Sequence, residues 1–290
     1  MRSPSHANPP DHRRLPAIAL MLIIAIVLAV AGVLFLAWWR QERITFQPPP
    51  PPFEDPGDTP RVQYAAADGT RLFAFLVGTP SADRGLILAF HGNADLAVWQ
   101  IPWARELAAR SGWQVMLAEY RGYGGAEGSP TYANAQEDSR AALRYAIESL
   151  RIPASRLVLF GHSLGSAVAT ELATEVNPAA LVLQSPFTSA RDMARIIVAP
   201  PITVAWRLIS RIHYDTETRV AALGVPVHVA HGDRDLIVPV RMGRRVHAAA
   251  KEKGQLLIIN GAGHNDVEDR GGERYWDFFL AALMGVSAVP

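Results

Sequence analysis

From residue 60 onward, short apolar segments alternate with longer amphipathic ones, and few folds are compatible with this order. The apolar segments are rich in β-branched residues and apolar on both faces, which is typical of buried parallel strands. Strands that alternate with helices form a parallel sheet covered by helices on both faces, so we expect an α/β fold. The first two strands flank Asp68-Gly69, which favours a hairpin turn, and should pair antiparallel. We expect strands at 61–66, 72–78, 85–91, 115–120, 157–161, 180–184, 225–231 and 256–260, and helices near 98–109, 134–150, 164–176, 241–251 and 273–284.

The composition excludes several classes of protein. Of the 290 residues, 49% are apolar, which is too many for a disordered chain and enough for one large domain with an appendage. The formal net charge of +1 gives no indication of a nucleic-acid partner. The absence of cysteine excludes disulfides, cysteine nucleophiles, thiolate metal sites and lipid anchors on cysteine.

The segment 156–165 carries the sharpest chemical signal. It reads Arg-Leu-Val-Leu-Phe-Gly-His-Ser-Leu-Gly, a strand that ends in G-x-S-x-G and leads into a helix. In such a nucleophile elbow the serine lies on a strained turn, and the small residues on either side let strand and helix approach each other. The bare pattern also occurs in ordinary glycine-rich turns, but the flanking strand and helix make it specific. We therefore expect Ser163 to be a nucleophile.

A serine hydroxyl is a poor nucleophile until a neighbouring base takes its proton. After an elbow the acid and the base follow in the order Asp, His, each at the carboxyl end of a strand. Asp235 lies in the loop after the strand at 225–231, and His264 lies in the glycine-rich loop after the strand at 256–260. We expect Ser163, Asp235 and His264 to form a catalytic triad, with Asp233 as the alternative acid.

A cluster of metal-binding residue types lies in the same region. His228, His231, Asp233 and Asp235 follow one another closely. Side chains three apart on a strand point to opposite faces, so the two histidines are not expected to converge on one ion. We expect neither a metal nor a cofactor.

Acyl transfer also needs donors for the negative charge that develops on the substrate oxygen. In this arrangement one backbone N–H follows the nucleophile, and the other comes from the loop after an earlier strand. The first would belong to Leu164. For the second we select Asn93, in the loop His91-Gly92-Asn93-Ala94-Asp95.

The N-terminal part contains a long uncharged segment. Residues 15–39 carry no charge, and at ~1.5 Å per helical residue they are long enough for a ~30 Å hydrocarbon core. Trp38 and Trp39 close the segment where interfacial aromatic residues occur in membrane helices. The alternative is a cleaved signal peptide, whose apolar region is ~7–15 residues long and ends in a small-x-small site. The greater length favours a single-pass transmembrane helix.

The residues around this segment predict its orientation and its connection to the domain. Arginines at positions 2, 13 and 14 precede it, and Arg40 and Arg43 follow it, a small excess that favours an extracytoplasmic catalytic domain. Five prolines at 48–52 should form a stiff spacer. Lys251 and Lys253 are the only lysines, an arginine bias that favours a GC-rich bacterial genome and hence an inner membrane. We expect a tail at 1–14, a transmembrane helix at 15–39, a proline-rich linker at 40–59 and one catalytic domain at 60–290.

Several short segments between residues 91 and 266 also carry a family pattern. They are His91-Gly92-Asn93-Ala94, Tyr120-Arg121-Gly122-Tyr123-Gly124, Gly161-His162-Ser163-Leu164-Gly165, Ser185-Pro186-Phe187-Thr188-Ser189, His231-Gly232-Asp233-Arg234-Asp235 with Val238-Pro239, and Gly263-His264-Asn265-Asp266. With them the chain resembles the membrane-anchored, single-domain group of α/β-hydrolase-domain serine hydrolases. The resemblance implies the α/β-hydrolase fold from about residue 60 to the C-terminus and the same triad. Two departures are Glu119, where the family usually has aspartate, and Ala126, in place of a small polar residue.

The substrate is less constrained than the chemistry. We expect hydrolysis of a carboxylic ester of a small molecule or a lipid through an acyl-enzyme, with an acyl-protein thioesterase, an amidase or peptidase, and a non-catalytic anchored binding module as alternatives. An insertion at about 187–222 should form a small lid. It includes the apolar residues 196–202, Trp206, Leu208, Ile209 and Ile212, which would suit an acyl chain or simply pack the lid onto the sheet.

Overall fold

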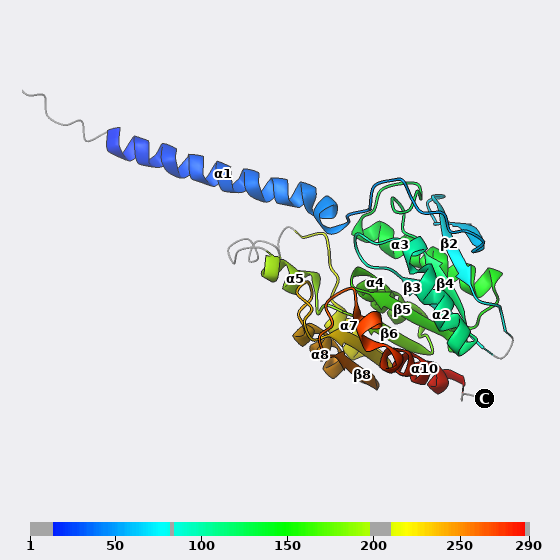
Figure 1. Ribbon diagram of the computed structural model, residues 1–290. Coiled ribbons are helices and arrows are strands. Elements are labelled where there is room, and N and C mark those ends of the chain that lie inside the picture. Colours follow the sequence, from blue (N-terminus) through cyan, green and yellow to red (C-terminus); the bar gives the residue numbers. More distant parts are fainter. Residues whose placement is uncertain (1–13, 82–83, 198–209, 288–290) are drawn as a thin grey trace, which may run out of the picture.

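The computed structural model describes residues 14–81, 84–197 and 210–287, and its centre is an eight-stranded sheet (Figure 1). The strand order is β1-β2-β4-β3-β5-β6-β7-β8. β2 pairs antiparallel with β1 and β4, and all other neighbours are parallel, so the prediction of a mostly parallel sheet with an antiparallel hairpin is confirmed. The strands are β1 (Arg61–Ala65), β2 (Arg71–Val77), β3 (Leu86–Phe90), β4 (Gln114–Ala118), β5 (Leu157–His162), β6 (Ala180–Gln184), β7 (Val227–Gly232) and β8 (Lys253–Ile259).

Helices pack in two groups around the sheet. α2 (Ile101–Ser111) and α10 (Glu273–Ser287) contact each other and several strands. The second group is a continuous series of contacts from α3 to α4, from α4 to α7 and from α7 to α8. Its members are α3 (Tyr132–Arg144), α4 (Leu164–Val176), α7 (Thr216–Ala222) and α8 (Val240–Ala249). The sequence did not predict α7, nor α5 (Ala190–Ile197) and α9 (Val267–Gly271), which are shorter than the predicted helices.

The core explains why the central strands are apolar on both faces. Every residue of β3, β4, β5 and β6 is buried. Between the sheet and α10, the ring of Trp103 stacks on Phe160 at a centroid distance of 4.6 Å and meets Phe279 edge-on at 5.6 Å. Its indole N–H donates to the Tyr275 hydroxyl at 3.0 Å, and that hydroxyl donates to Gln184 at 2.8 Å. The aromatic cluster therefore buries no unpaired indole or phenol group.

Two glycines allow α4 to begin directly against the sheet. A Cβ atom on Gly165 would lie 2.0 Å from the carbonyl oxygen of Phe90 in β3. One on Gly161 would lie 2.2 Å from the carbonyl oxygen of Gly165. Any side chain at either position would separate strand from helix, so both residues must be glycine for this packing.

The N-terminal helix α1 (Arg14–Thr45) extends away from the domain (Figure 1). Within it, Ile18–Thr45 has a mean hydropathy of 3.2 in its most apolar window, and by length and composition it is able to cross a membrane. Most of the apolar side chains from Ile18 to Trp39 are exposed, whereas Gln41 and Phe46 are buried against the domain. The predicted tail before residue 14 lies outside the described residues.

The insertion at 187–222 contains α5 and α7. Its middle, residues 198–209, lies outside the described part of the chain, and with it the apolar residues 198–202, Trp206, Leu208 and Ile209. Ile212 is buried in the main core and Ile196 is exposed.

Candidate active site

Ser163 occupies the turn between β5 and α4. Its backbone has φ 51° and ψ −113°, in the left-handed region that is unfavourable for a residue with a side chain. The turn is held by three hydrogen bonds. The Ser163 N–H donates to Gln184 O at 3.0 Å, and Ser163 O accepts the Ser166 N–H at 3.0 Å and the Ser166 hydroxyl at 2.5 Å. The geometry is that of a nucleophile elbow.

The structure brings the three residues of the predicted triad together. His264, in the loop between β8 and α9, has Nε2 at 2.9 Å from Ser163 Oγ. Its Nδ1 lies 2.7 Å from Asp235 Oδ2, in the loop after β7. In the neutral tautomer with the proton on Nδ1, the ring donates to Asp235 and accepts from Ser163, the arrangement that general-base catalysis requires.

Asp235 is buried and held in place by its own loop. Oδ1 accepts the backbone N–H groups of Ile237 at 2.9 Å and Val238 at 2.8 Å. Oδ2 also lies 3.2 Å from Nε2 of His231, which donates to Val238 O at 2.8 Å. Burial alone raises the pKa of Asp235, but the hydrogen bonds from His231 and His264 outweigh it and hold the pKa well below its usual range. The carboxylate therefore remains charged beside the His264 ring.

The alternative acid has a different place. Asp233 Oδ1 accepts the backbone N–H of Gly261 at 2.6 Å, and its own N–H donates to Ile259 O at 3.1 Å. It thereby connects the loop after β7 to the turn after β8. The carboxylate that contacts His264 is that of Asp235.

The two predicted oxyanion donors flank Ser163. Leu164 is the first residue of α4. Asn93 follows Gly92, where an added Cβ would lie 3.5 Å from Ser163 Cβ and 3.2 Å from Nδ1 of His162. The loop after β3 therefore passes directly beside the serine, and Gly92 leaves the room for it.

Sequence reasoning missed the buried pair that supports this loop. Glu119, which follows β4, accepts a hydrogen bond from His91 Nε2 at 2.6 Å and one from the Ala97 N–H at 3.1 Å. Both side chains are almost fully buried. Burial favours the neutral His91 ring, but the Glu119 carboxylate, with Asp95 and the Gly92 carbonyl, outweighs burial and raises the pKa of His91. The unusual glutamate at 119 is a visible signal, but its partner lies 28 residues away.

The His228–His231 pair does not converge on a common point. His228 contacts Phe278 and accepts the N–H of Gln255, whereas His231 faces Asp235 and Gly243. Within the described ranges, no group of three or more His, Asp or Glu side chains is arranged to hold a metal ion.

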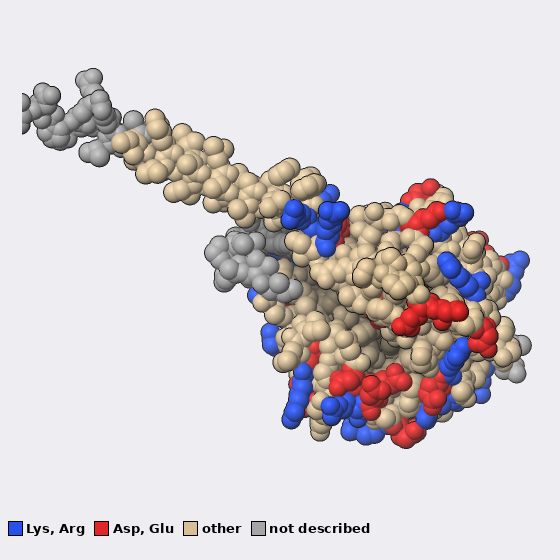
Figure 2. Space-filling model, turned by 45° about the horizontal axis from the view of Figure 1, so that its top comes forward, with Lys and Arg blue, Asp and Glu red and all other residues tan. Residues whose placement is uncertain are grey.

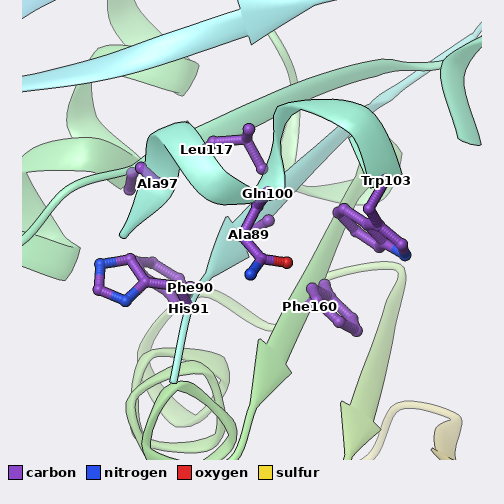
Figure 3. A pocket seen from close by; sticks show the side chains of 9 residues that line it. Ala89, Phe90, His91, Ala97, Gln100, Trp103, Leu117 and Phe160 are labelled. Atoms are coloured by element: carbon purple, nitrogen blue, oxygen red, sulfur yellow. The ribbon is translucent and has the colours of Figure 1, made fainter. Parts of the chain in front are cut away.

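A small cavity lies beside the loop after β3. Gln100 extends into it between His91 on one side and Trp103 and Phe160 on the other (Figure 3). Its volume suits about one water molecule. Ser163, Asp235 and His264 do not line it, so this cavity is not the place where substrate meets the serine.

His162 contacts both the ring and the backbone of His264. The two rings lie 5.1 Å apart between centroids, and His162 Nε2 donates to the His264 carbonyl oxygen at 3.2 Å. Burial, followed by the electrostatic effect of the neighbouring His264 ring, lowers the pKa of His162 to about 4. The ring is therefore neutral in the folded protein at neutral pH.

This depressed pKa predicts a pH-dependent stability. Between pH 6.5 and about 4 the unfolded chain binds a proton at His162 and the folded chain does not, so acid favours unfolding. When the pH is lowered from 6.5 to 4.5, the free energy of unfolding of the native protein should fall by on the order of 2 kcal/mol more than that of His162→Gln. Urea denaturation of both proteins at the two pH values measures it. If the two proteins differ in their free energy of unfolding by the same amount at pH 6.5 and pH 4.5, the prediction is contradicted.

Comparisons with known proteins identify the family. The family model described as serine aminopeptidase, S33, matches residues 81–217. The chain is 33% identical over 264 residues to the uncharacterized protein Rv2307c of Mycobacterium tuberculosis, covering 88% of this chain and 90% of that protein. It is 32% identical over 235 residues to the alpha/beta hydrolase domain-containing protein WAV2 of Arabidopsis thaliana, covering 75% and 76%.

Among solved structures, the esterase Pf2001 of Pyrococcus furiosus has a similar fold. The TM-score is 0.66 at 18% identity, covering 82% of this chain and 98% of the esterase. At that identity the likeness speaks for the fold alone. The similarity in sequence to WAV2 shows the family, and the shared fold agrees with it: this chain belongs to the α/β-hydrolase family of enzymes.

Proposed function

We propose that this enzyme is a serine hydrolase that cleaves a carboxylic ester of a small molecule or lipid through an acyl-enzyme intermediate. The observation that carries the proposal is the continuous hydrogen-bonded series from Ser163 Oγ through His264 to Asp235, at 2.9 and 2.7 Å. The low pKa of Asp235 keeps a negative charge where it stabilises the imidazolium that forms during the reaction.

The reaction would proceed in two halves. His264 Nε2 takes the proton of Ser163 as Oγ attacks the carbonyl carbon, and then gives that proton to the departing alcohol. Water next enters, loses a proton to His264 and attacks the acyl-enzyme, which releases the acid and restores the serine. In both halves the backbone N–H groups of Leu164 and Asn93 would stabilise the oxyanion.

A second activity is favoured by one specific observation. The matching family model takes its description from serine aminopeptidases, so cleavage of an amide bond by the same three residues is the principal alternative. A thioester of an acylated protein is the other substrate that the same mechanism would accept. Each needs only a different leaving group, because the acyl-enzyme is common to all three.

The first test is hydrolysis of p-nitrophenyl esters from acetyl to palmitoyl by the full chain in detergent. Ser163→Ala should lower kcat by about 10⁴-fold or more, because the variant lacks the hydroxyl that attacks the carbonyl carbon. A mutant that keeps a tenth of the activity would refute the assignment. Turnover of thioesters or aminoacyl amides, but not of esters, would select one of the alternatives. A native chain that no fluorophosphonate labels at Ser163 would favour the non-catalytic binding module.

Asp235 and Asp233 provide a matched pair of variants that tests which aspartate is the acid of the triad. Asp235→Asn should lower kcat by about 10⁴-fold, since the amide cannot hold His264 in the required tautomer. Asp233→Asn keeps an oxygen that can accept from Gly261 and should keep kcat within about tenfold of the native value, because its contacts are structural. The same ester assay measures both. Equal losses in the two variants would contradict the assignment of Asp235.

We also propose that α1 anchors the enzyme in a membrane, with the catalytic domain outside the cytoplasm. The helix has exposed apolar side chains between Ile18 and Trp39, and basic side chains gather where it meets the domain (Figure 2). Among them, the Arg40 guanidinium lies 6.0 Å from the Trp39 ring and that of Arg211 lies 4.5 Å from the Trp38 ring. Tryptophan and arginine together are typical of the headgroup region of a membrane.

Fractionation of bacterial cells that express the full chain tests the anchor. The protein should stay in the membrane pellet after alkaline carbonate extraction and keep its full mass, since an apolar helix of this length inserts stably. Protease added to spheroplasts should digest the domain. A soluble product that has lost its N-terminus would show that the segment is a cleaved signal peptide. Protection of the domain from protease would show that the domain lies in the cytoplasm, contrary to the proposal.

A further inference from the structure

The loop that carries Asn93 is tied to the end of the N-terminal helix. The Asn93 side chain makes three hydrogen bonds, two of them to the segment that follows the apolar span. Its Nδ2 donates to Thr45 O at 2.7 Å, and its Oδ1 accepts the backbone N–H of Gln47 at 2.9 Å. The third donor to Oδ1 is the hydroxyl of the buried Tyr123, at 2.8 Å.

The segment that holds Asn93 is itself fixed to the domain. Phe46, between Thr45 and Gln47, is 3% exposed and belongs to the main core. One turn earlier, Glu42 accepts the N–H of Tyr132, the first residue of α3, at 3.0 Å. Figure 1 shows the end of α1 close to α3.

A second tie connects α1 to the chain that enters α7. Gln41 Oε1 accepts the N–H of Arg211 at 2.6 Å, and Arg211 Nη2 donates to Trp38 O at 3.1 Å. The end of α1 is therefore hydrogen-bonded to α3 and to the chain before α7, in addition to its contact with Asn93.

The loop needs such support because it is strained. Ala94, next to Asn93, has φ 51°, in the left-handed region that a residue with a Cβ rarely adopts. A strained backbone of this kind persists only where surrounding contacts determine it. On one side of the strained residue the Asn93 side chain is bonded to residues 45 and 47, and on the other Asp95 accepts a hydrogen bond from Gln100.

We infer that the backbone of Thr45 and Gln47 is a positioning element for the oxyanion donor on Asn93, so that the N-terminal helix is coupled to catalysis as well as serving as a tether. This inference rests on the proposed function, since it assigns the Asn93 N–H to the oxyanion. Thr45 and Gln47 act through the Asn93 side chain, which sets where the backbone N–H of the same residue points.

The sharpest variant is Gln47→Pro in the full chain. Proline removes the N–H that donates to Asn93 Oδ1, and it extends the existing proline run at 48–52. It also removes the side chain, whose Nε2 donates to Ile44 O at 3.0 Å, so Gln47→Ala, which loses only the side chain, measures that share of the effect. Misplacing an oxyanion donor should lower kcat for p-nitrophenyl esters by about 10- to 100-fold with little change in KM. Glu54→Pro, at an exposed position of the same linker, is the matched control and should keep the native kcat.

A double-mutant cycle separates positioning from general damage. Asn93→Ala keeps the backbone N–H but removes all three side-chain hydrogen bonds, so it should lower kcat by itself. If Gln47→Pro acts through Asn93, it should have little further effect in the Asn93→Ala background. An equal fold-loss in both backgrounds would overturn the inference, because Gln47 would then act elsewhere.

A second variant tests the same contact without introducing a proline. Asn93→Asp retains an oxygen for Gln47 and Tyr123 but places an oxygen against the Thr45 carbonyl, and it should also lower kcat. If neither Gln47→Pro nor Asn93→Asp reduces kcat below that of Glu54→Pro, the inference is wrong while the proposed function stands. If the native chain neither hydrolyses the esters nor reacts with a fluorophosphonate at Ser163, both are wrong.

Discussion

The close approach of α4 to β3 and β5 is the contact on which the site depends. At position 165 even a methyl group would lie 2.0 Å from the carbonyl oxygen of Phe90. Because nothing separates helix from sheet, the chain turns from β5 into α4 within one residue, and Ser163 takes a left-handed conformation at the carboxyl edge. The same contact sets the distance from the serine to the loop after β3. Parallel pairing of β3, β5, β6, β7 and β8 then brings the loops with Asp235 and His264 to that edge.

A second layer of buried polar groups holds the residues that would do the chemistry. Asp235 receives two backbone N–H groups and the ring of His231, and His264 has His162 beneath its backbone. The loop with Asn93 stands on the His91–Glu119 pair. Groups fixed in this way need little rearrangement when charge develops on the substrate, and such preorganisation is a major source of catalytic power. The hydrogen bonds also offset part of the cost of burying these polar side chains.

Much of this arrangement could be predicted from the sequence, and the reasons are local. Buried strands are short apolar runs, and the predicted helix at 164–176 coincides with α4 because a glycine-flanked elbow defines its start. Asp235 and His264 were located from the strands before them. The contacts that could not be predicted join residues that lie far apart in the sequence and share no pattern. Glu119 contacts His91 across 28 positions, and Asn93 contacts Thr45 across 48. The helix α7 was missed for another reason. It has only seven residues, too few for a clear amphipathic period.

The order of the residues along the chain has a consequence for newly made protein. Ser163 precedes His264 by 101 positions, and His264 follows β8, the edge strand that pairs with β7 alone. At ~5–20 residues per second, a ribosome needs about 5–20 s to cover that interval. During this time α1, β1 to β5 and α4 have been synthesised, but the ring that would activate the serine has not. Under the proposed mechanism the hydroxyl would therefore be inert on the nascent chain, and reactivity would begin only when the last strand joins the sheet.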